Sequence, residues 1–255
     1  MNLKFYPNGC AILIENKLRV LVVADTHFGI ETDLHQQGFH FKSETKTRLS
    51  ILTSIIEESN PDYLVVLGDF KHKIPYVTFQ EKKEIPYILN VIRNLCELRV
   101  LPGNHDIGIE KYLTDDELLP VTGTVIDGYG YMHGHTFPNK QLAGKLIFCG
   151  HIHPIINIYD EVGCSLKGMP CYLLAEIDNS MVHLPQSDNP TRVLLVPAFY
   201  GYVGGVDVRN ISNSRKSPIS KAIKMDTAEI FLNDGTYIDS LSHLSPTPPT
   251  PPKKS

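Results

Sequence analysis

The chain has 255 residues, of which 42% are hydrophobic and 20% are charged, and its net charge is −4. This composition is typical of a globular protein with one large or two small domains, and it excludes an intrinsically disordered chain. The acidic balance argues against a broad, sequence-independent grip on nucleic acid, although a local basic groove is compatible with it.

The cysteines and the apolar runs favour an intracellular protein. The five cysteines are odd in number and include no CxxC pair, so we expect reduced thiols and neither a disulfide framework nor a zinc knuckle. The apolar run at 10–14 is short and lacks the basic leader of a secretory signal. No run approaches the roughly 20 apolar residues of a membrane span. We therefore expect a cytoplasmic protein that does not enter a membrane.

Five apolar runs recur along the chain, and each ends in histidine, aspartate or asparagine. They are LRVLVVADTH at 18–27, DYLVVLGDFKH at 62–72, LRVLPGNHD at 98–106, GYGYMHGH at 128–135 and KLIFCGHIH at 145–153. The first two runs are apolar in their centres without alternation, which is typical of strands covered on both faces.

Helical spacing of apolar residues separates the first three runs. It predicts one helix around 49–56 that ends before Asn60-Pro61, and a second over 79–95 that Pro86 either kinks or starts. The order strand, helix, strand, helix, strand predicts a layered α/β fold with helices flanking the sheet.

The pattern changes after residue 153. Residues 160–190 are rich in turn formers and predict loops around a short strand at 171–177, and a further strand is expected at 193–198. A hairpin is expected from 228–232 and 236–238 around the turn Asn233-Asp234-Gly235. We expect 1–244 to form one domain, and the proline-rich tail at 245–255 to be extended and solvated.

The polar ends of the five runs predict a metal site. Ligands of open α/β sheets bind beyond the carboxyl ends of the strands, so we expect these side chains to converge: Asp25, His27, Asp69, Asn104, His133, His135, His151 and His153. Oxygen and imidazole donors suit Mn, Fe, Zn or Ni without any thiolate. A single Asp-x-His or His-x-His pair is a weak signal, but five such elements in order are a strong one. Asp69 has two carboxylate oxygens with which to bridge two ions, and Gly68 before it allows close approach of the backbone.

These motifs resemble those of the calcineurin-like metallophosphoesterases, in the order D25-T-H27, G68-D69, G103-N104-H105-D106, H133 and G150-H151-I-H153. The segments GDFKHKIP at 68–75, GHIHP at 150–154, MPCYLL at 169–174 and VPAFYGYVGG at 196–205 resemble an archaeal and bacterial subfamily of phosphohydrolases. That subfamily is related to DNA-ligase-associated phosphoesterases and, more distantly, to SbcD-type nucleases. The resemblance covers about 10–245 and implies an α/β sandwich of two β-sheets flanked by α-helices.

The resemblance also implies roles for individual residues. Asp25, His27 and His153 would bind one metal, Asp69 would bridge, and a second metal would be bound by Asn104, His133 and His151. His133 is preferred over His135 because it lies directly at the strand end, which leaves His135 to face the substrate. The two divalent ions are expected to be manganese, with iron, zinc or nickel as alternatives.

The implied chemistry is hydrolysis by a water that two metals, about 3.5–4 Å apart, convert to hydroxide. His105 would act as the acid or stabilise developing charge, and Asp106 would hold its other ring nitrogen. The family commonly has an acidic residue where this chain has His72. We assign His72 to substrate binding together with Lys71 and Lys73, and a solvated loop is an equal alternative.

Three functional hypotheses follow from the sequence. The first is a phosphodiesterase acting on nucleic acid or a nucleotide. The acidic net charge favours a short or single-stranded substrate, and the implied kinship suggests DNA-repair partners. The second is a phosphomonoesterase or nucleotide pyrophosphohydrolase. The third, a non-catalytic scaffold on the same fold, is disfavoured because His105 and all candidate ligands are present. The natural substrate and the oligomeric state do not follow from the sequence.

Overall fold

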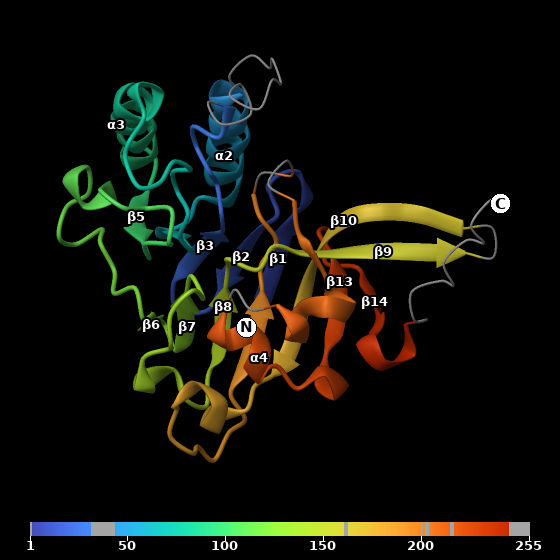
Figure 1. The fold of residues 1–255 in the computed structure, drawn as a ribbon. Coiled ribbons are helices and arrows are strands. Elements are labelled where there is room, and N and C mark those ends of the chain that lie inside the picture. The colour runs from blue at the N-terminus through green and yellow to red at the C-terminus, as the bar shows by residue number, and fades with distance from the viewer. Residues whose placement is uncertain are drawn as a thin grey trace.

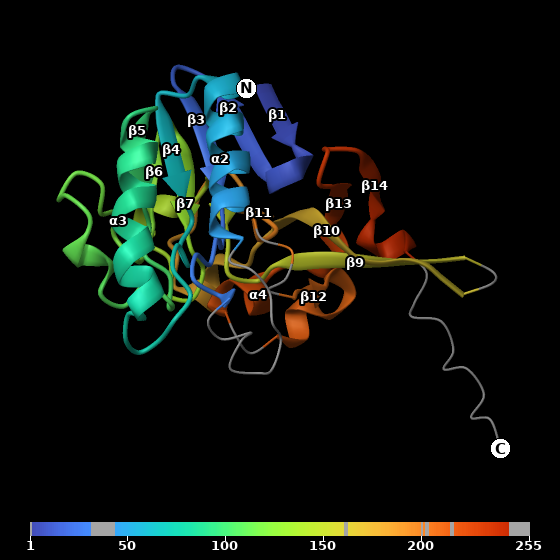
Figure 2. The same ribbon diagram turned by 90° about the horizontal axis from the view of Figure 1, so that it is seen from above.

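Two β-sheets face each other in the computed structural model, and two long helices cover the outer face of the first sheet (Figures 1 and 2). The structure describes residues 2–31, 44–160, 163–199, 201, 204–214 and 217–244, with the side chains of 159–165 left out. The expected proline-rich tail at 245–255 lies outside the described residues. The layered α/β sandwich of two sheets flanked by helices is confirmed.

The first sheet has five strands in chain order, β1 (Asn2–Tyr6), β2 (Ala11–Glu15), β3 (Arg19–Val23), β4 (Tyr63–Val66) and β5 (Glu97–Val100). Strands β3, β4 and β5 are parallel, whereas β1 and β2 form an antiparallel edge. Along β3, Leu21 and Val23 pack towards the helices while Val20 and Val22 pack towards the second sheet. Burial on both faces explains the continuous apolar runs.

Helices α2 (Thr45–Ser59) and α3 (Phe79–Arg93) make the crossovers between the parallel strands. Helix α2 ends at Asn60, which adopts a left-handed φ of 41° just before Pro61. Helix α3 begins with a capping box between Thr78 and Glu81, so Pro86 does not start it. Pro86 lies on the exposed face inside the helix, where water can replace the hydrogen bond that proline cannot donate.

The second sheet has nine strands. They are β6 (Thr124–Ile126), β7 (Tyr129–Met132), β8 (Leu146–Cys149), β9 (Pro154–Asp160), β10 (Gly163–Glu176), β11 (Arg192–Leu195), β12 (Val206–Asp207), β13 (Glu229–Leu232) and β14 (Tyr237–Ser240). Strands β7, β8 and β11 are parallel neighbours, and β13 and β14 form the expected hairpin. The short helix α4 (Pro218–Ala222) packs on the outer face with a separate core cluster.

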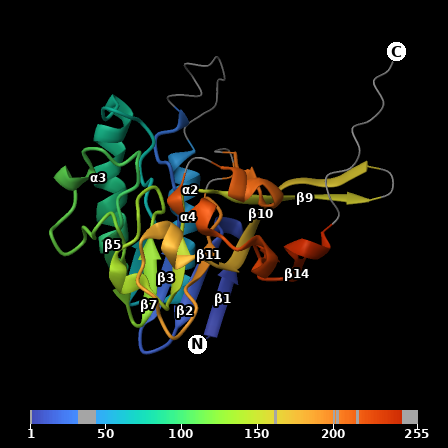
Figure 3. The ribbon, with the colours of Figure 1, turned by 60° about the horizontal axis from the view of Figure 1, so that its bottom comes forward.

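The sequence predicted loops over most of 160–190, and this prediction is wrong for residues 163–170, which belong to β10. Strands β9 and β10 form a long antiparallel hairpin that extends away from the two sheets (Figure 3). Its pairing shifts register at two places, between Cys164 and Leu166 and between Leu166 and Met169. These irregularities, together with Gly163, Gly168 and Pro170, conceal the period-two pattern by which a strand is recognised.

The cysteines agree with the expectation of reduced thiols as far as their side chains are described. Cys10, Cys96, Cys149 and Cys171 are free, and Cys164 lies among the side chains left out. Burial raises the pKa of Cys10 to about 12, which keeps this thiol protonated and unreactive.

Candidate metal centre

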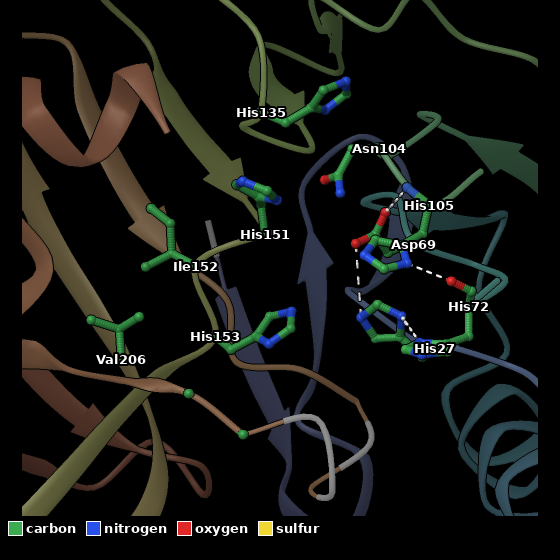
Figure 4. Close-up of a pocket in the computed structure, with 12 residues that line it drawn as sticks. His27, Asp69, His72, Asn104, His105, His135, His151, Ile152, His153 and Val206 are labelled. Atoms are coloured by element: carbon green, nitrogen blue, oxygen red, sulfur yellow. Dashed lines mark hydrogen bonds and ion pairs between the residues drawn. The ribbon is translucent and has the colours of Figure 1, made fainter. Parts of the chain in front are cut away.

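The carboxyl ends of β3, β4 and β5 in one sheet and of β7 and β8 in the other meet at one cleft of about 590 Å³ (Figure 4). The cleft is lined by most of the residues singled out from the sequence, namely His27, Asp69, His72, Asn104, His105, His135, His151 and His153. The remaining ligand candidates, Asp25 and His133, are fully buried beneath it. The structure thus brings the predicted metal ligands to one place together with His72, His105 and His135, whereas Asp106 does not line the cleft.

Backbone hydrogen bonds between neighbouring loops set the positions of the first ligands. The amide of Asp25 donates to the carbonyl of Gly68 at 3.1 Å, and the amide of His27 donates to the carbonyl of Asp69 at 2.8 Å. The loops after β3 and β4 therefore continue the pairing of their strands and are held to each other by backbone hydrogen bonds.

Five candidate ligands have left-handed backbone conformations. Their φ values lie between 44° and 69°, and they are Asp25, His27, Asp69, His151 and His153. Side chains with a Cβ rarely adopt this region, and strain of this kind is concentrated at functional sites. The bend that follows each strand turns the next side chain into the cleft.

Glycine is required beside these ligands because the packing leaves no room for a Cβ. At Gly103, a Cβ would lie 2.2 Å from Asp69 Oδ1, and at Gly68 it would lie 2.4 Å from His133 Nδ1. At Gly150, a Cβ would lie 2.9 Å from Asp25 Oδ2. The glycines of the sequence motifs thus let ligands from different strands approach one another.

Among the described residues, three groups of candidate ligand atoms lie at this centre: His27, His72 and His105 form one, and Asp69 lies between the other two. Asp25, His27 and His153 form the first of these two and Asp69, His133 and His151 the second, with ligand atoms within 4.8 Å of one another in each group. Asp69 Oδ2 lies 3.8 Å from His27 Nε2, and Asp69 Oδ1 lies 3.5 Å from His133 Nε2. Each oxygen of this carboxylate therefore faces a different group, which is the arrangement required of a bridging ligand.

The tautomer of His133 is determined by a backbone carbonyl. His133 Nδ1 lies 2.7 Å from the carbonyl oxygen of Leu67. A carbonyl only accepts, so Nδ1 carries a proton and Nε2 is directed at the centre. Nε2 lies 3.3 Å from Asn104 Oδ1 and 3.1 Å from His151 Nδ1. A histidine ligand must present an unprotonated nitrogen to a metal, and Nε2 is the nitrogen of His133 that is placed to do so.

Three further polar atoms are buried in one of these groups. Asp25 Oδ1 and His153 Nε2 lie 3.2 Å apart as an ion pair, and His27 Nε2 has no hydrogen bond among the described residues. Leaving a buried polar atom unsatisfied costs about 1–3 kcal/mol. The donor set of imidazole nitrogens and carboxylate oxygens fits a divalent transition metal.

Burial and charge shift the pKa values in the same centre. Burial raises the pKa of Asp25, but the charge of His153 and the other histidines outweighs burial and holds it well below its usual range. Burial lowers the pKa of His27 well below its usual value, so this ring is neutral and able to bind a metal. Burial also lowers the pKa of His135 to about 4, and the neighbouring charges of His133 and His151 add to the shift.

His72 and His105 lie side by side at one wall of the cleft. Their rings stack with centroids 5.2 Å apart, and His105 Nδ1 bonds to the carbonyl oxygen of His72. His72 Nδ1 lies 3.2 Å from His27 Nδ1. His72 is therefore a neighbour of the metal-binding group as well as a lining residue.

The role expected of Asp106 is wrong. Its carboxylate accepts from the amide of Lys71 at 3.0 Å and from the amide of Gly103 at 2.8 Å, whereas the His105 ring bonds to a main-chain carbonyl. Asp106 is buried and joins the loops after β4 and β5. Desolvation by burial raises its pKa to about 6, and the nearby charge of Asp69 raises it further.

The expected phosphate contact by Lys71 is also wrong. This side chain is completely buried, and its Nζ donates to the carbonyls of Lys73 and His105 at 2.5 Å. Lys71 therefore holds the backbone at Lys73 and His105 instead of pointing into the cleft.

Sequence reasoning missed two buried residues that hold the site loops. Arg48 of α2 donates to the carbonyls of Thr26 and His27 at 2.9 and 2.8 Å and pairs with Glu31. Glu81 caps α3 and accepts from the amides of His72 and Lys73. The capping-box spacing of Thr78 and Glu81 is a signal that would have revealed Glu81, whereas nothing in the sequence marks Arg48.

Comparison with known proteins agrees with the class of protein that the fold and site define, a metal-dependent phosphoester hydrolase. A model of the calcineurin-like phosphoesterase family matches residues 18–248. The chain belongs to that family. No curated protein sequence matches the chain.

Solved structures resemble the chain at low sequence identity. The nuclease MPE of Pseudomonas putida is 19% identical, with a TM-score of 0.55 and coverage of 91% of this chain and 90% of that one. The phosphoesterase Yfce of E. coli is 16% identical, with a TM-score of 0.33 and coverage of 55% and 73%. The first of these supports the fold. Within the described residues, no helix is both long and apolar enough to cross a membrane.

Proposed function

We propose that the protein is a phosphodiesterase that uses two divalent metal ions, with manganese as the expected ion and a nucleic acid or nucleotide as the substrate. The observation that carries the proposal is the position of Asp69, which groups with His133 and His151 through one carboxylate oxygen and faces His27 of the neighbouring group with the other. Asp25, His27 and His153 would hold one ion, and Asn104, His133 and His151 would hold the other. When bound, such a pair polarises the phosphoryl oxygens and lowers the pKa of the attacking water.

The remaining residues of the cleft bind the substrate and move the proton. The bond from His105 Nδ1 to the His72 carbonyl fixes the orientation of the His105 ring, whose Nε2 is the proton donor for the leaving oxygen. His135 lines the same cleft and, with its pKa lowered to about 4, offers the substrate a neutral hydrogen-bonding group at neutral pH. His72 stacks on His105 and restricts its movement.

The first experiment measures Mn²⁺-dependent hydrolysis of bis(p-nitrophenyl) phosphate together with the metal content of the protein. We expect about two manganese ions per chain. Replacing His105 by alanine should lower kcat about 10²–10⁴-fold, the usual contribution of a general acid, with the metal content retained. His243→Ala is the matched control, because this histidine is largely exposed and pairs with Asp239 outside the cleft. A wild type that binds two metals but is inactive on all phosphoesters would instead be a non-catalytic scaffold.

A second experiment separates diesterase from monoesterase activity. Single-stranded DNA, RNA, cyclic nucleotides and phosphomonoesters are compared as substrates at one manganese concentration. The fold is shared with a nuclease of Pseudomonas putida, so a nucleic-acid diester is the first substrate to test. Higher kcat/KM for the monoesters would favour the phosphomonoesterase alternative.

A further inference from the structure

A line of exposed aromatic residues runs from the loop that follows His72 along α3. Tyr76 is 60% exposed on the loop before the helix, and Phe79 and Tyr87 are 85% and 61% exposed on the helix itself. Phe79, Lys83 and Tyr87 follow one another at intervals of four residues and therefore share a face. The opposite face of α3 is buried in the core through Ile85, Ile88, Leu89 and Ile92. We call Tyr76, Phe79, Lys83 and Tyr87 the aromatic strip.

Lysine side chains lie beside the aromatic rings. Lys73 Nζ lies 5.8 Å from the centre of the Tyr76 ring, and Lys83 lies between Phe79 and Tyr87 on the exposed side of the helix. Glu84, next to Lys83 in the chain, accepts hydrogen bonds from Thr45 Oγ1 and Gln80 Nε2. The strip therefore combines apolar rings with positive charge.

The loop that carries Tyr76 is fixed to both the helix and the catalytic loop. Glu81, which is 1% exposed, accepts from the amide of Lys73 at 2.8 Å with one oxygen and from the amide of Thr78 at 2.7 Å with the other. Lys71 Nζ bonds to the carbonyls of Lys73 and His105. The strip is therefore presented on a rigid support that is continuous with His105, and little conformational entropy is lost when a ligand binds.

We infer that the aromatic strip is a stacking surface for the unpaired bases of a single-stranded nucleic acid whose phosphodiester lies in the cleft. Successive bases stack on exposed aromatic rings whatever their sequence, while lysines accompany the phosphates. The bases of a duplex are stacked on one another and cannot use such a surface. The acidic net charge of −4 also suits a short local contact better than a long duplex footprint. This inference rests on the proposed function, because it names the substrate class for the same site.

The test is binding of a fluorescently labelled 12-nucleotide oligothymidylate, measured by anisotropy in EDTA so that hydrolysis is suppressed. The double variant Phe79→Ala/Tyr87→Ala should raise Kd about tenfold or more, since two stacking contacts are removed. Both side chains point to solvent, so the variant should fold normally, as its thermal unfolding will show. Tyr237→Ala is the control, because Tyr237 is 49% exposed on β14 of the other sheet and should leave Kd unchanged.

Hydrolysis of bis(p-nitrophenyl) phosphate distinguishes this inference from the proposed function. That ester carries no nucleotide to lie along α3, so the double variant should hydrolyse it at the wild-type rate. A wild type that hydrolyses neither this ester nor any of the other phosphoesters, but binds the oligonucleotide through the strip, would refute the proposed function and retain the binding surface.

Three results would overturn the inference. One is equal oligonucleotide affinity of the wild type and the double variant. Another is tighter binding of a blunt duplex of the same length than of the single strand. The third comes from sedimentation: if the wild type is a dimer and the double variant a monomer, the strip is a contact between copies of this chain.

Discussion

At the scale of single residues, the candidate metal centre depends on glycines as much as on the ligands, because a glycine has no side chain to keep two loops apart. Gly103 allows Asp69 to sit against the loop after β5, because a Cβ there would lie 2.2 Å from Asp69 Oδ1 and 2.4 Å from its amide nitrogen. The same carboxylate oxygen accepts from the amide of His105 at 2.8 Å. One glycine thus sets the distance between the bridging candidate Asp69 and His105.

Replacing Gly103 by alanine should therefore weaken metal binding. Either Asp69 or the loop of His105 must shift, and we expect manganese affinity to fall about 10–100-fold, as when a partner of a metal ligand is lost. Isothermal titration calorimetry with Mn²⁺ measures this. Gly201→Ala is the control, since a Cβ there would meet nothing within 4 Å. Equal affinities in both variants would show that the close approach does not position Asp69.

Asp106 gives a second prediction at this scale. Asparagine has one acceptor oxygen where the carboxylate has two, so Asp106→Asn leaves the amide of either Lys71 or Gly103 without its partner. We expect the free energy of unfolding to fall by about 1–3 kcal/mol, measured by urea denaturation. Unchanged stability with a large loss of hydrolysis would instead support the orienting role that the sequence alone suggested.

At the scale of elements, the strands that carry ligands were the most predictable part of the chain. Each is a continuous apolar run, because β3 and its parallel neighbours are covered on both faces, and each ends in a polar residue forced into the cleft. The β9–β10 hairpin was missed because its register shifts break the alternation. Candidate ligands could be named from the sequence, whereas the hydrogen-bond partners of Asp106 and Lys71 could not. A ligand type is a property of the residue, whereas a hydrogen-bond partner depends on how loops pack.

The segment after the GNHD loop is tied to α3 by a further ion pair. Arg93 Nε donates to Glu117 Oε1 at 2.7 Å, its terminal nitrogen reaches Oε2 at 2.6 Å, and the amide of Thr114 donates to Oε2 at 2.9 Å. The Arg93 side chain holds the pKa of Glu117 below its usual value. Because the folded pKa is the lower one, the stabilisation is complete above the unfolded pKa of about 4.3 and is lost as the pH falls through the folded value.

Glu117→Gln should therefore lower the free energy of unfolding at pH 7 by about 1 kcal/mol, since Arg93 is partly exposed to solvent. The difference from the wild type should shrink as the pH is lowered from about 5 to 3, as both proteins lose the carboxylate charge. Chemical denaturation at several pH values measures it. A difference that is constant over this range would mean that packing of the side chain, and not its charge, is responsible.

At the scale of the whole molecule, the candidate ligands join the two sheets. Asp25, Asp69 and Asn104 follow strands of the first sheet, whereas His133 and His151 follow strands of the second. The interface between the sheets is apolar along its length, with Val20, Val65 and Leu67 facing Tyr131 and Phe148. Apart from the buried hydroxyls of Tyr131 and Tyr172, its buried polar atoms gather at the end that meets the cleft. Metal binding should therefore strengthen the contact between the sheets as well as complete the active site.

Manganese should then raise the thermal stability of the protein, and EDTA should lower it. A ligand that binds only the folded state adds about 2.7 kcal/mol at 100 times its Kd, which corresponds to a rise in Tm of about 5–10 °C for a chain of this size. Differential scanning calorimetry of the wild type and of Asp25→Asn/Asp69→Asn, with and without Mn²⁺, measures it. The double variant removes one ligand candidate from the first group and the bridging one, so its Tm should not respond to manganese. An equal response in both proteins would mean that the stabilising ions bind elsewhere, and that the acceptors gathered between the sheets are not a metal centre.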